Sequence, residues 1–70
     1  MTEQQRVIAI RLLREQEIIR SNQNAIIRKR FGDRITIALT SECDQRDREI
    51  DALLATIALL DSLAQEEPET

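Results

Sequence analysis

The 70-residue sequence has no histidine, tryptophan or tyrosine, and it contains one residue each of cysteine, glycine, proline and phenylalanine. A single cysteine and no histidine exclude a disulfide framework and make a structural zinc site improbable on chemical grounds. So few glycines and prolines argue against a sheet with several turns, whereas the ten isoleucines and eight leucines favour long helices. We therefore expect an all-α protein with no metal and no cofactor.

The residues of a catalytic site are missing as well. Cys43 has no histidine in the chain to activate it as a nucleophile. We interpret it as a small apolar residue near a helix seam, with a disulfide between two copies and a catalytic role as the alternatives. The acidic residues are spread along helix faces, and two helices do not readily form the pocket that acid–base catalysis needs. We predict that the protein is not an enzyme.

The first helix has signals at both ends. Thr2 and Gln5 have the spacing of a capping box, which predicts a helix from about residue 3 to about residue 31. Gly32 is a residue favoured just past a helix end, and Asp33 is a favoured N-cap for the next helix. We therefore place a turn at about residues 31–34.

The second helix is less sharply bounded at its start. Residues 35–40 alternate as in a strand but also fit a helix face, and we favour the helix because a lone strand would have no partner in the chain. Ser41 followed by Asp44 offers a later start as the alternative. We predict a helix from about residue 34 to about residue 65, a disordered acidic tail at 66–70, and one helical-hairpin domain over residues 1–70.

The apolar residues of 50–63 cover roughly two-thirds of the helix circumference, more than one neighbouring helix can cover. A chain of this size buries only about 60% of the surface that its unfolded form exposes. We therefore expect an antiparallel two-helix hairpin, completed as a four-helix bundle by dimerisation or by the helices of a partner. The predicted intrachain seam consists of Ile8, Leu12, Ile19, Ile26, Ile50, Leu53, Ile57 and Leu60. The predicted partner interface consists of Leu13, Ile27, Leu54, Leu59 and Leu63.

A polar stretch at residues 21–24 interrupts the apolar pattern of the first helix. Asn22 falls on the face of Ile8, Leu12, Ile19 and Ile26. A buried asparagine in a helix seam can fix the register and the oligomeric state at a cost in stability. The alternative is a partly hydrated interruption near the middle of the bundle.

The charges divide unevenly along the chain. Residues 1–34 carry eight basic and four acidic side chains, a net charge of +4, and residues 35–70 carry two basic and nine acidic ones, a net charge of −7. Opposite halves favour a chain folded back on itself. Basic residues near the turn give the alternative of a bundle-type nucleic-acid-binding regulator, with Arg28, Lys29, Arg30 and Arg34 as its contact site. The first three also lie where cations stabilise a helix end.

No apolar run approaches 18 residues and the N-terminus lacks the pattern of a signal peptide, so we expect a cytoplasmic protein.

A resemblance to a known family is carried by Ala52-Leu53, the run from Ile57 to Leu63, the polar middle and the acidic end. In these features the sequence resembles the small helical-hairpin cochaperones that guard the needle subunit of bacterial type III secretion systems. The resemblance implies a cytoplasmic hairpin that pairs with a larger helical-repeat chaperone and keeps an aggregation-prone needle subunit soluble.

These observations predict a small non-enzymatic protein–protein interaction module, such as an adaptor, a regulator or a chaperone subunit. It would act by burying apolar helix faces. Its partner would be a second copy in a homodimer or another helical protein, and no membrane is involved.

Overall fold

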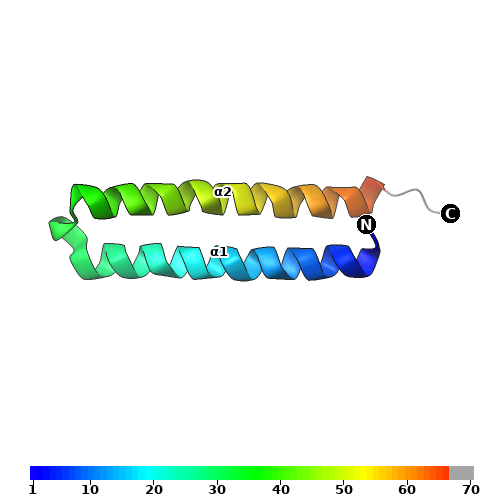
Figure 1. Ribbon diagram of the computed structural model, residues 1–70, viewed down its shortest axis with the longest axis horizontal. Coiled ribbons are helices and arrows are strands. Elements are labelled where there is room, and N and C mark those ends of the chain that lie inside the picture. The colour runs from blue at the N-terminus through cyan, green and yellow to red at the C-terminus, as the bar shows by residue number, and fades with distance from the viewer. Residues whose placement is uncertain (67–70) are drawn as a thin grey trace.

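The computed structural model describes residues 1–66, which form two long helices joined by a short connection (Figure 1). Helix α1 spans Glu3–Phe31, the 3-10 turn η1 spans Gly32–Arg34, and helix α2 spans Ile37–Glu66. The two helices lie side by side and antiparallel, so that the start of α1 and the end of α2 meet at one end of the hairpin. The described residues contain no strand. The predicted all-α hairpin is confirmed. The predicted tail at 66–70 begins one residue too early, because Glu66 is the last residue of α2, and residues 67–70 lie outside the described residues.

The capping box predicted for α1 is present. The backbone N–H of Gln5 donates to Oγ1 of Thr2 at 3.1 Å, and the backbone N–H of Thr2 donates to Oε1 of Gln5 at 3.0 Å. Two of the backbone donors left open at a helix start are satisfied in this way. The helix starts at Glu3, where the sequence placed it.

Helix α1 ends at the only glycine of the chain. Gly32 has φ 46° and ψ −120°, a conformation that L-residues with a side chain rarely adopt, and its N–H donates to the carbonyl of Arg28. The chain then passes through η1 and an extended Ile35 with φ −63° and ψ 131°. The predicted turn is therefore confirmed at Gly32.

Helix α2 begins at Ile37 rather than at residue 34. Oγ1 of Thr36 accepts a hydrogen bond from the backbone N–H of Leu39 at 3.1 Å, so Thr36 caps this helix. The predicted cap at Asp33 is wrong because Asp33 belongs to the 3-10 turn. The alternative start at Ser41 is also wrong, since residues 37–40 are already helical.

Burial identifies the seam between the helices, because in a two-helix hairpin only the other helix can cover a mid-helix side chain. On α2, Cys43 and Ile57 are buried, with exposed fractions of 1% and 4%, and Leu60 is buried at 9%. Leu39 before them, and Arg46, Ile50 and Leu53 between them, are half-buried. These residues alternate at steps of four and three, the spacing of a coiled-coil seam. The predicted α2 seam residues thus face α1.

The seam of α1 lies on a different face from the predicted one. Ile8, Leu12, Ile19 and Ile26 are 41–59% exposed. Of the covered residues, six follow alternating steps of three and four, and they are Ile10, Leu13, Glu17, Arg20, Asn24 and Ile27; Arg6, Ala9 and Ser21 are half-buried beside them. The prediction is corrected because it followed the most apolar stripe, whereas the middle of the real seam is polar. Leu13 and Ile27, predicted to contact a partner, lie in this seam.

Neither helix, over the part of the chain that the structure describes, has an apolar stretch of the length and hydropathy needed to cross a membrane.

Candidate interaction surface

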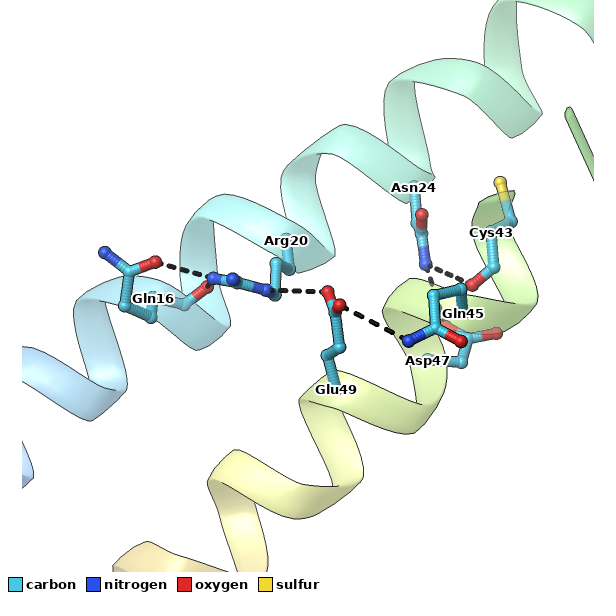
Figure 2. Close-up of polar contacts among 7 residues, drawn as sticks. All are labelled: Gln16, Arg20, Asn24, Cys43, Gln45, Asp47 and Glu49. Carbon is cyan, nitrogen blue, oxygen red and sulfur yellow. Dashed lines mark hydrogen bonds and ion pairs between the residues drawn. The ribbon is translucent and has the colours of Figure 1, made fainter. Parts of the chain in front are cut away.

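A buried asparagine occupies the middle of the seam. Asn24 is 2% exposed, and its Nδ2 donates to the carbonyl oxygen of Cys43 at 3.1 Å and to Oδ1 of Asp47 at 2.9 Å (Figure 2). Its own Oδ1 is buried and has no partner among the described residues. Asn22, the residue that the sequence pattern indicated, is exposed. The hypothesis of a buried asparagine at position 22 is therefore wrong, and the buried asparagine of the seam is Asn24.

Two ion pairs flank this asparagine, one on each side of the hairpin. Nη2 of Arg28 lies 2.8 Å from Oδ2 of Asp47, and Nε of Arg20 lies 3.0 Å from Oε1 of Glu49. Figure 2 shows that Arg20 and Glu49 each contact a further residue of their own helix. Arg20 donates to Oε1 of Gln16 at 2.6 Å, and Glu49 accepts from Gln45 at 3.5 Å. These contacts, with those of Asn24, hold α1 and α2 in one register.

The ion pairs shift the acidity of their members. The hydrogen bond from Arg28 lowers the pKa of Asp47 below its ordinary value, and the hydrogen bond from Asn24 acts in the same direction. The hydrogen bond from Arg20, and then that from Gln45, lowers the pKa of Glu49. The contact with Asp47 raises the pKa of Arg28. All three side chains are therefore charged at neutral pH.

The two ion pairs define two flanks of the hairpin. The Arg20 flank carries Gln16 and Glu49, and a groove of about 300 Å³ on this side is lined by residues of both helices, among them Gln16, Ala52 and Thr56. Residues three, four or seven positions apart share a helix face. By this spacing the Arg20 flank comprises Leu12, Gln16, Ile19, Gln23, Ile26 and Arg30 of α1, and Ala38, Glu42, Gln45, Glu49, Ala52, Thr56, Leu59 and Leu63 of α2.

The opposite side, the Arg28 flank, contains the Arg28–Asp47 pair. The same spacing assigns to it Val7, Arg11, Arg14, Ile18, Ser21, Ala25 and Arg28 of α1, and Thr40, Asp44, Asp47, Asp51, Leu54, Ala58 and Asp61 of α2. Seven of these fourteen residues are charged. On the Arg20 flank the charged residues are Arg20 itself, at the edge of the seam, and Arg30, Glu42 and Glu49, and large apolar side chains recur at seven-residue steps on α1.

The apolar side chains of the Arg20 flank are open to solvent in the hairpin. Leu12, Ile19 and Ile26 are 51%, 50% and 59% exposed, and Leu59 and Leu63 are 62% and 43% exposed. Leu59 and Leu63 were predicted to face a partner, and they lie on the same flank as Leu12, Ile19 and Ile26, which were wrongly assigned to the seam. Leu54, the third predicted partner residue of α2, is exposed on the Arg28 flank.

The basic cluster near the turn does not form one surface. Successive helix residues point about 100° apart, so Arg28, Lys29 and Arg30 diverge. Arg28 is engaged with Asp47 on one flank, and Arg30 lies on the other. Arg34 follows in η1 and is exposed.

No group of three or more histidine, cysteine, aspartate or glutamate side chains in residues 1–66 is arranged to hold a metal ion. Comparisons with protein-family models, curated proteins and solved structures give no significant match.

Proposed function

We propose that the protein is a non-enzymatic interaction module that buries its Arg20 flank against the helices of another chain, completing a four-helix bundle. The observation that supports this most directly is the exposure of five large apolar side chains along that flank, Leu12, Ile19, Ile26, Leu59 and Leu63.

The small size of the core supports the proposal energetically. The buried apolar side chains of the described hairpin are Cys43, Ile57 and Leu60. Full burial of a leucine or isoleucine side chain stabilises a fold by about 1.5–3 kcal/mol, whereas ordering a residue costs about 1–2 kcal/mol in backbone entropy alone. A second set of buried leucines and isoleucines would supply the stability that the isolated hairpin lacks.

The partner class follows from the shape of this flank. Apolar residues at seven-residue steps fit the seam of another helix, since helices in bundles pack side chains at this period. A helical-repeat chaperone, as the resemblance to type III secretion cochaperones implies, and a second copy of this chain both present such helices. The divergence of Arg28, Lys29 and Arg30 disfavours the nucleic-acid alternative, which needs basic groups gathered on one face.

Photo-crosslinking tests the proposal. The photoreactive residue p-benzoylphenylalanine is placed at Ile19 on the Arg20 flank or, as a matched control, at Ile18, which is equally exposed but faces the Arg28 flank. In cells of the source organism, the Ile19 variant should give a discrete crosslinked protein band that the Ile18 variant lacks. Equal crosslinking at both positions, or none at either, would overturn the proposal.

A further inference from the structure

We propose that the occupant of the Arg20 flank is the same flank of a second copy, with the turns of the two hairpins at the same end of the bundle. This inference rests on the proposed function and names its partner. Two symmetric pairings can bring one flank onto itself. With turns at the same end, α1 packs on α2 of the second copy. With turns at opposite ends, α1 packs on α1 and α2 on α2.

Charge distinguishes the two pairings. Helix α1 carries seven basic and three acidic residues, a net charge of +4, and α2 carries two basic and seven acidic residues, a net charge of −5. The same-end pairing places each basic helix between two acidic ones. The opposite-end pairing sets +4 against +4 and −5 against −5, which is repulsive over the distance between packed helices.

The positions of the apolar residues on the flank also favour the same-end pairing over the opposite-end pairing. The contacts Arg20–Glu49 and Asn24–Cys43 set the register of the hairpin, so that Leu12 lies level with Thr56 and the first turns of α1 lie level with Leu59 and Leu63. The same-end pairing therefore brings the apolar ends of both flanks together. The opposite-end pairing brings Leu59 and Leu63 level with residues 40–45 of the second copy, which are mostly polar.

The sizes of the facing side chains also fit. In the same-end pairing this register sets Leu12, Ile19 and Ile26 level with Thr56, Glu49 and Glu42 of the second copy, and Ala52 lies level with the space between Leu12 and Ile19. The small side chain of Ala52 leaves room there for the leucine and isoleucine side chains to interdigitate. The opposite-end pairing sets these three large side chains of α1 against the stripe of the same three side chains on α1 of the second copy.

The distance between spin labels at the turn decides between the pairings. In a Cys43→Ala background, Asp33→Cys labels η1 and Asp51→Cys labels the middle of α2. With turns at the same end the Asp33 labels should lie about 20–30 Å apart, since packed helix axes are 8–10 Å apart and the label arms add the rest. With turns at opposite ends they would be separated by about 45 Å or more, the length of α2.

The Asp51 label is the control, because it lies near the middle and gives a short distance in either pairing. A short distance at both positions supports the inference. A short distance at Asp51 with a long one at Asp33 overturns the same-end arrangement. No dipolar coupling at either position overturns the second copy as partner. In that case a crosslinked band at Ile19 of a mass other than a dimer would still uphold the proposed function.

Discussion

Asn24 is the residue that most constrains how the helices meet. Its amide gives two hydrogen bonds to α2, while its carbonyl oxygen is buried without a partner among the described residues. An unpaired buried acceptor destabilises by about 1–3 kcal/mol. Asn24 therefore selects one register at the expense of stability, a role known for seam asparagines in coiled coils.

Replacing Asn24 by leucine should raise the melting temperature, because the unpaired oxygen is removed and Asp47 keeps its contact with Arg28. A gain of about 1 kcal/mol corresponds to about 4–8 °C for a chain of this size. Thermal unfolding followed by circular dichroism measures it. Asn22→Leu, at an exposed position, is the matched control and should change the melting temperature little. A lower melting temperature for Asn24→Leu would show that the amide is a net stabilising contact.

The Arg28–Asp47 and Arg20–Glu49 pairs predict a loss of stability in acid. Both carboxylates have a folded-state pKa below the unfolded value, so their contribution is complete above the unfolded value, about 4, and is lost as the pH falls through the folded one. Asp47→Asn should flatten the fall in melting temperature below about pH 4 relative to the parent. Asp51→Asn, which removes a carboxylate outside the ion pairs of residues 1–66, is the control. Identical acid profiles for Asp47→Asn and the parent would contradict this account.

At the scale of elements, the ends of α1 follow from local chemistry and were predictable. Thr2 with Gln5 and the single Gly32 leave few alternatives in a sequence so poor in turn residues. The start of α2 was not predictable from caps alone, because Asp33, Thr36 and Ser41 all qualify. Because the conformation of Gly32 leads the chain into the 3-10 turn, Thr36 is the residue that caps α2.

The apolar pattern of the sequence predicts the seam on α2 but not on α1. On α2 the most apolar stripe is the seam, and Ile57 and Leu60 were found from the sequence. On α1 the seam includes Arg20 and Asn24, which have partners on α2, and Glu17, which accepts a hydrogen bond from Ser21 of its own helix; the hydropathy of these residues does not predict their place. A search for polar residues at seam spacing on both helices would have detected this polar layer. The most apolar stripe of α1 is instead left exposed.

Gly32 allows a stereochemical test of the connection. Gly32→Ala should destabilise the hairpin by about 1–2 kcal/mol because an L-residue is strained at φ 46°, although an added Cβ would meet no atom within 4 Å. D-alanine, for which this backbone is relaxed, should stabilise by about 0.4–1 kcal/mol by restricting the unfolded chain. Chemical synthesis supplies both chains, and thermal unfolding compares them. Equal melting temperatures for the two epimers would refute the assigned turn.

At the scale of the whole molecule, the two flanks predict different responses to the same chemical change. Leu12→Gln with Leu59→Gln on the Arg20 flank should weaken association by at least about tenfold, since each leucine contributes about 1.5–3 kcal/mol when buried. Val7→Gln with Leu54→Gln alters similarly exposed residues on the Arg28 flank and should leave association unchanged. Sedimentation equilibrium measures both. Equal weakening by the two pairs would mean that the flanks are not distinct.

The melting temperature as a function of protein concentration tests most directly whether the hairpin depends on a second copy to cover its Arg20 flank. For a folded dimer a hundredfold increase in concentration adds about 2.7 kcal/mol to the free energy of unfolding, so the melting temperature should rise steadily across that range. A cooperative transition at the same temperature throughout would show that the hairpin is stable alone, and it would contradict the account.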